Sequence, residues 1–131
     1  MERNTEERLI KQARQRLPVA YAPYSGIRVA AAVQTADGTV FCGVNVENAS
    51  YGLTVCAERN ALAAAVAEGH SQFSAMAVVS DAVSVQSPCG ACRQVLQEFS
   101  PAMELVFVSP AGRFCYTVRD LLPCAFTLEE E

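Results

Sequence analysis

Two cysteine motifs about thirty residues apart constrain the fold of this chain more than any other feature. The first contains Cys56 and Glu58, and the second contains Cys89 and Cys92 with two residues between them. Both motifs begin predicted helices, whose positive N-terminal ends favour thiolate over thiol. Cys89 and Cys92 are three positions apart, so a helix places them on one face. A fold that unites three thiolates can bind Zn²⁺ and leave the fourth coordination position open, as catalytic sites do.

Length and composition limit the remaining possibilities. The chain has 131 residues, 51% of them hydrophobic and 18% charged, which predicts one folded domain over 1–131. The formal charge is −4 without a basic stripe, which argues against a nucleic-acid partner. No apolar run could span a bilayer, and the charged first residues do not resemble a secretory signal. We therefore expect a cytoplasmic protein with no membrane partner and with reduced cysteines.

Hydrophobic periodicity predicts three helices and five strands. An Asp-Gly turn at 37–38 indicates a hairpin, and the short link at 109–112 makes the last two strands antiparallel. The order predicts an α/β fold, a three-layer α-β-α sandwich with a mixed five-stranded sheet. The predicted helices cover 5–17, 56–68 and 88–99, and the predicted strands cover 27–35, 40–46, 75–80, 105–108 and 114–118.

Capping signals sharpen the expected helix boundaries. Asn4 with Glu7, Thr54 and Ser87 are the expected N-terminal caps of the three helices. Gly69 is the expected stop of the second helix.

The remaining cysteines and the single histidine bear on whether a metal site would be closed. His70 lies at the far end of the second predicted helix, about 20 Å of helical rise from Cys56. Cys42, Cys115 and Cys124 belong to no paired motif. Any of them could close a structural zinc site, although we expect all three to be buried as small apolar side chains.

Glu58 is placed to serve a metal without binding it. Two residues from Cys56, its carboxylate could take a proton from a zinc-bound water and pass it on. Alone, such a glutamate would more often be a partner of the helix dipole. A lone Cys-x-x-Cys would equally fit a redox pair or half of a structural zinc site. The joint pattern is the signature of zinc nucleobase deaminases.

At these motifs the chain resembles the short, homotetrameric cytidine deaminases, and the resemblance extends over nearly its whole length. It implies hydrolytic deamination of cytidine and 2′-deoxycytidine to uridine and 2′-deoxyuridine, with release of ammonia, in pyrimidine salvage. It also implies one zinc per subunit on the three cysteines, with Glu58 as proton shuttle. The matching stretches are 22–25, 43–51, 56–59, 88–94 and 121–123, with Phe126.

Asn45 and Glu47 are the expected sugar-binding residues. They are two apart at a strand end, so their side chains face one side, and an amide beside a carboxylate suits sugar hydroxyls. A polar strand end that caps a loop would look the same. The resemblance assigns both positions to the ribose 3′-hydroxyl. A carboxylate there would also repel phosphate, so we expect the free nucleoside to be preferred to its monophosphate.

The resemblance extends to five further residues. Ala57 and Ile27 are expected to bind the substrate, and family members commonly have, in place of Ile27, a Phe that packs against the base. Tyr51 and Phe126 are expected to reach the active site of a neighbouring subunit of a homotetramer. Arg59 is expected to donate to the cysteine sulfurs and so withdraw charge from the metal.

Two alternative functions remain: a deaminase of another aminated heterocyclic nucleoside, as in blasticidin-type enzymes, and a non-catalytic structural zinc module.

Overall fold

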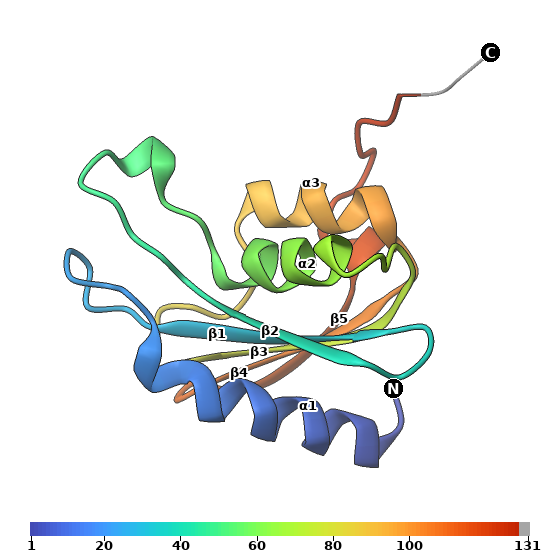
Figure 1. Ribbon diagram of the computed structural model, residues 1–131, viewed down its shortest axis with the longest axis horizontal. Helices are drawn as coiled ribbons and strands as arrows, with labels where there is room; N and C mark the ends of the chain where they lie inside the picture. The colour runs from blue at the N-terminus through green and yellow to red at the C-terminus, as the bar shows by residue number, and fades with distance from the viewer. Residues whose placement is uncertain (129–131) are drawn as a thin grey trace.

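A computed structural model describes residues 1–128 and shows a central sheet between two helical layers (Figure 1). Residues 129–131, the end of the predicted domain, lie outside the described part. Helix α1 (Arg3–Arg16) covers one face of the sheet, and α2 (Ala57–Ala67) and α3 (Gly90–Phe99) lie side by side on the other. The predicted three-layer sandwich is confirmed.

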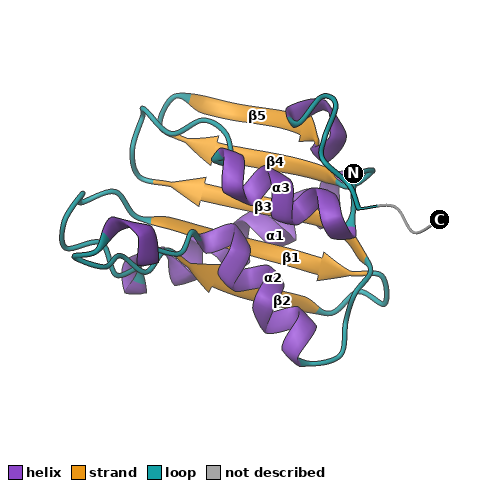
Figure 2. Cartoon of the chain, turned by 90° about the horizontal axis from the view of Figure 1, so that it is seen from above, coloured by secondary structure: helices purple, strands orange, loops and turns teal. Residues whose placement is uncertain are grey.

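The sheet is mixed, with the strand order β2-β1-β3-β4-β5 (Figure 2). The pair β3–β4 is parallel because α3 crosses between them, whereas the other three pairs are antiparallel. The last two strands are antiparallel, as predicted. The strands are β1 (Val29–Thr35), β2 (Val40–Val44), β3 (Phe73–Ser80), β4 (Glu104–Ser109) and β5 (Gly112–Thr117).

The predicted N-terminal caps were wrong for all three helices. Helix α1 begins earlier than expected, after Glu2, which places the Asn4 pair inside the helix. Cys56 and Cys89 are the N-cap residues of α2 and α3. The Thr54 hydroxyl instead accepts a hydrogen bond from the Asn48 N–H, and the Ser87 hydroxyl accepts one from the Arg93 guanidinium. The expected caps fail because both hydroxyls accept hydrogen bonds from groups only six residues away in the sequence, and not from the N–H groups of the first helical turn.

The end of α2 follows the prediction. Gly69 has a φ of 92° just after the helix, and its N–H donates to Val66. This left-handed position favours glycine and terminates the helix. Short 3-10 helices cover Leu17–Val19, Tyr51–Leu53 and Val118–Leu121. Among the described helices, none has the length and apolar character needed to cross a membrane.

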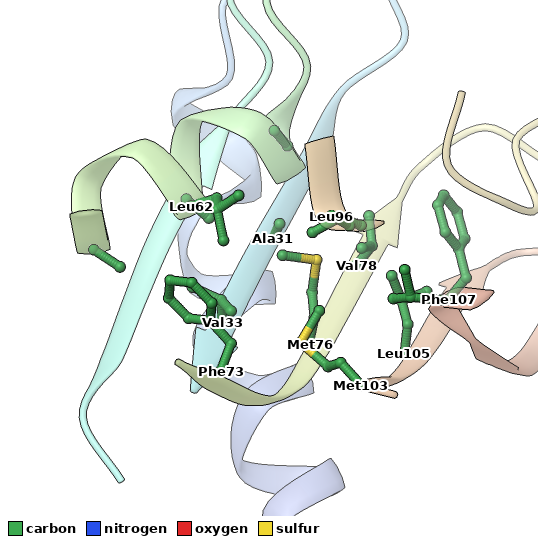
Figure 3. Close-up of a cluster of buried hydrophobic side chains, with 14 residues drawn as sticks. Ala31, Val33, Leu62, Phe73, Met76, Val78, Leu96, Met103, Leu105 and Phe107 are labelled. Atoms are coloured by element: carbon green, nitrogen blue, oxygen red, sulfur yellow. The ribbon is translucent and has the colours of Figure 1, made fainter. Parts of the chain in front are cut away.

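Two apolar clusters hold the layers together. The larger lies beneath α2 and α3, where Leu62 and Leu96 belong to the same buried cluster as Met76, Val78 and Phe107 of the sheet (Figure 3). The smaller lies between α1 and the opposite face. The larger cluster therefore supports both helices whose first turns carry the cysteine motifs.

Helix α2 rests directly on strand β2. A Cβ built on Gly43 would lie 2.3 Å from the backbone nitrogen of Ala61 and 2.6 Å from the Ala57 carbonyl oxygen, so only glycine permits this approach. The Asn60 amide donates to the Val44 carbonyl at 2.8 Å. These contacts set the position of the cysteine end of α2 relative to the sheet.

Candidate active site

The fold brings the two cysteine motifs together at one end of the sheet. The sulfurs of Cys56, Cys89 and Cys92 all lie within 4.8 Å of one another, and the Cys56 and Cys89 sulfurs are 3.6 Å apart. Cys56 and Cys89 cap their helices with extended backbone, and Cys92 follows in the first turn of α3. All three sulfurs therefore lie at helix N-termini, where the aligned peptide dipoles stabilise thiolates.

The spacing of these sulfurs suits zinc. Tetrahedral bonds of about 2.3 Å place two sulfur ligands about 3.7 Å apart, close to the separation of Cys56 and Cys89. Within residues 1–128, no fourth His, Cys, Asp or Glu side chain joins the group. His70 instead packs against the Phe41 ring at 5.3 Å between ring centroids. A set of three protein sulfurs leaves one coordination position for water or substrate.

Arg59 compensates part of the negative charge of the sulfurs. Its Nη2 donates to the Cys56 sulfur at 3.4 Å. Hydrogen bonds from Cys92 and Arg59 lower the pKa of Cys56 to about 5. The pKa of Cys92 is raised, because its proton takes part in the bond to Cys56 and because the site is buried. The pKa of Arg59 also lies above its ordinary value, since the thiolate beside it favours the charged guanidinium.

Glu58 is a buried carboxylate beside the sulfur cluster. It follows Ala57 in the first turn of α2, and the residue is only 4% exposed. Burial raises the pKa of Glu58 to about 7, and the Cys56 thiolate adds to the rise. A carboxyl group with a pKa near neutrality can both take up and release a proton under physiological conditions.

A cavity of about 570 Å³ opens beside these groups. Its volume falls in the range of small-molecule sites, and its wall is mostly apolar with a few polar groups. Asn45 and Ala57 line it together with Cys56, Glu58 and Cys89. The remaining lining residues are Val29, Thr54, Ser84, Val85, Gln86, Ser87 and Phe107.

The predicted sugar-binding residues also organise the loop before β1. The Asn45 amide donates to the Ile27 carbonyl at 2.8 Å and accepts from the Val29 N–H at 2.9 Å. Glu47 accepts hydrogen bonds from the Tyr24 N–H and from both the N–H and the hydroxyl of Ser25. These bonds, that from Ser25 above all, lower the pKa of Glu47. Asn45 lines the cavity, whereas Glu47 does not.

Three further predicted residues lie outside the cavity of this single chain. Ile27 is half-buried, and its N–H donates to the Ser25 hydroxyl. Tyr51 is 82% exposed and Phe126 is 72% exposed. Gln94 of α3 donates to the Phe126 carbonyl at 3.0 Å, which fixes the backbone at that position. The roles of these residues toward a substrate or a neighbouring subunit stay predictions.

Sequence reasoning missed one side of the cavity. The segment 84–87 has no regular secondary structure and no local motif that marks it as a wall. Its place becomes predictable only from its position just before the Pro88-Cys89 step.

The expectation for the unpaired cysteines was also wrong: Cys115 and Cys124 are exposed and Cys42 is half-buried. Cys115 lies on an edge strand, and Cys124 lies in the irregular segment after β5.

Comparison with known proteins decides the family. Residues 3–109 match the family model of the cytidine and deoxycytidylate deaminase zinc-binding region. The chain belongs to this deaminase family.

Individual members are similar over almost their full length. A cytidine deaminase of Halalkalibacterium halodurans is 49% identical over 124 residues, which are 93% of this chain and 94% of that protein. A cytidine deaminase of Sporosarcina psychrophila is 44% identical over 95% of this chain and 93% of that protein. The crystal structure of cytidine deaminase from Burkholderia pseudomallei superposes with a TM-score of 0.88 at 46% identity, covering 96% of this chain and all of that one. The three cysteine sulfurs are therefore a zinc-binding site.

Proposed function

We propose that this chain is a cytidine deaminase, which converts cytidine and 2′-deoxycytidine to uridine and 2′-deoxyuridine with release of ammonia. The observation that carries the proposal is Glu58, a buried carboxylate beside three clustered sulfurs in the wall of a nucleoside-sized cavity. Membership of the deaminase family supports it.

The three cysteines would bind the metal, whereas Glu58 transfers protons. Cys56, Cys89 and Cys92 would hold zinc, which supplies a Lewis acid that lowers the pKa of water toward neutrality. Glu58 takes the proton from the water that adds to C4 of the base and delivers a proton to N3. Glu58 then takes the second proton, from the hydroxyl now on C4, and passes it to the departing amino group, so that ammonia leaves and the carbonyl of uridine forms.

Substrate recognition follows from the groups around the cavity. Asn45 keeps one amide hydrogen beyond its bond to Ile27, which is free to donate to a sugar hydroxyl. Glu47 accepts a sugar hydroxyl on its remaining lone pairs and disfavours a phosphate by charge. Ala57 and Ile27 contact the base, and Arg59 offsets the charge of the thiolates.

The assembly we propose is a homotetramer whose subunits share their active sites. Large apolar side chains are exposed around the 3-10 helix Tyr51–Leu53, with Tyr51 82% and Leu53 65% exposed. Phe126 is exposed as well. Such side chains are typical of surfaces that associate. We further propose one domain over 1–131 and a cytoplasmic role in pyrimidine salvage, where the free thiols would stay reduced.

The decisive experiment follows the ultraviolet change that accompanies conversion of cytidine to uridine. We expect turnover by the zinc-loaded wild-type protein and a loss of about 10²-fold or more in kcat for Glu58→Gln, with zinc still bound. Glu68→Gln, at the exposed end of the same helix, is the matched control and should behave as wild type. Absence of turnover in zinc-loaded wild type would point instead to another aminated heterocycle or to a structural zinc module.

A further inference from the structure

The wall segment Ser84–Ser87 lines the cavity but belongs to no helix or strand. Among the hydrogen bonds of the described residues, its only backbone–backbone bond runs from the Val85 N–H to the Ala82 carbonyl, at 3.2 Å. Val85 also packs against the larger apolar cluster. The position of Gln86 and Ser87 must therefore depend on groups from elsewhere in the fold.

Two side chains, one from β5 and one from the adjacent helix α3, supply that support. The Tyr116 hydroxyl, from β5, donates to the Gln86 carbonyl at 2.9 Å. The Arg93 guanidinium, from α3, donates to the Ser87 hydroxyl at 2.9 Å. Together they hold consecutive residues of the wall from two sides.

Neither support lines the cavity, and each is anchored on its own side. The Tyr116 ring packs against the larger apolar cluster, and its backbone is paired with Leu105 of β4. Arg93 also donates to the Pro88 carbonyl at 2.8 Å and to the Leu121 carbonyl at 2.9 Å. The planar guanidinium thus joins the wall, the step before Cys89 and the segment after β5 in one fixed geometry.

We propose that Tyr116 and Arg93 are positioning residues that set the affinity for substrate by fixing the wall Ser84–Ser87. This inference rests on the proposed deaminase function, because it concerns the same cavity. Neither residue acts on the reacting atoms. Loosening the wall should therefore weaken the binding of substrate and transition state alike and leave the chemical step almost unchanged.

The test is Tyr116→Phe, which removes one hydroxyl and keeps the ring in the core. We expect KM for cytidine to rise about three- to tenfold, the effect of one neutral hydrogen bond, with kcat within about twofold of wild type. Zinc content should match wild type, and the thermal midpoint should fall by no more than about 4 °C. Cys115→Ala, the exposed neighbour on the same strand, is the control and should leave KM unchanged.

Arg93→Lys tests the second support, because a lysine keeps the charge but cannot reach three acceptors at once. It too should raise KM more than it lowers kcat. Wild-type KM in both variants overturns the proposal. A parallel loss of kcat and thermal stability also overturns it, since that pattern indicates general destabilisation.

Hydrogen exchange separates this inference from the proposed function. In Tyr116→Phe, a peptide covering 81–89 should exchange its amide hydrogens faster, while peptides from β3 and β4 exchange as in wild type. This measurement does not depend on turnover. If wild type failed to deaminate cytidine, the proposed function would fail, and faster exchange would still show that Tyr116 holds the wall. Unchanged exchange would refute the positioning role.

Discussion

The two helices that deliver the sulfurs are attached to the rest of the molecule in different ways. Helix α2 lies against the sheet backbone to backbone, with Gly43 at the contact and Asn60 bonded to a strand carbonyl. Helix α3 is held at its first turn by the side chain of Arg93, which reaches the loop before the helix and the 3-10 helix after β5. Close backbone contact and one hydrogen bond attach α2, whereas three hydrogen bonds from one side chain attach the start of α3, so the two helices should respond to different substitutions.

The largest expected effect breaks the α2 contact. Gly43→Ala places a Cβ against helix backbone that cannot yield, so α2 must move away from β2. We expect the free energy of unfolding to fall by about 3 kcal/mol or more, together with zinc content and activity. Urea unfolding and metal analysis measure both losses.

Gly90→Ala is the matched substitution on α3, where nothing lies within 4 Å of the added methyl group. It should change the free energy of unfolding by no more than about 0.5 kcal/mol. Equal losses in the two alanine variants would contradict the contrast between the two helices.

Smaller effects are expected when the side-chain amide that forms a hydrogen bond from each helix is removed. Asn60→Ala leaves the partly buried Val44 carbonyl without its donor and should cost about 1 kcal/mol in urea unfolding. Gln94→Ala on α3 removes an exposed bond to the Phe126 carbonyl and should cost only a few tenths of that. A greater loss from Gln94→Ala would show that the tail stabilises α3 more than the sheet stabilises α2.

The smallest effect concerns the hairpin that aligns β2 beneath α2. Asp37 accepts hydrogen bonds from the hydroxyls of Thr35 and Thr39 and from the Thr39 N–H, which lower its pKa from 3.8 to about 2. A depressed folded-state pKa stabilises the fold above about pH 4, and this contribution disappears as the pH falls toward 2.

Asp37→Asn should therefore lower the thermal midpoint slightly at pH 7 and not at pH 2. Thermal scans across that range measure the difference. A midpoint difference that is the same at both ends of the range would show that the carboxylate charge plays no part.

The parts of the molecule that were predictable from sequence are those with local or periodic signals. The sheet type followed from short turns and apolar runs, and the union of Cys56 with Cys89 and Cys92 followed from their motifs. The family of the chain was also recognisable from those motifs and is confirmed.

The parts that escaped prediction depend on contacts between distant residues. No pattern near Gly43 indicates that a helix will lie within van der Waals distance of it, and none near Gln86 points to Tyr116. The helix caps failed for a different and local reason, because each hydroxyl has a competing donor six residues away. The Thr54 and Ser87 hydroxyls are suitable caps in isolation, but Asn48 and Arg93 bind them in the fold.

The sulfur cluster also has a consequence for the polymer as a whole. Cys56 and Cys89 are 33 positions apart, and the chain between them forms all of α2 and β3. An ion bound to both sulfurs therefore closes a ring in the chain, much as a disulfide would. By the loop-entropy relation for cross-links, a ring of that size lowers the conformational entropy of the unfolded state, which stabilises the folded state by about 4 kcal/mol. The zinc ion would then also stabilise the fold as a cross-link. Its removal by a chelator should therefore lower the free energy of unfolding as well as stop the reaction.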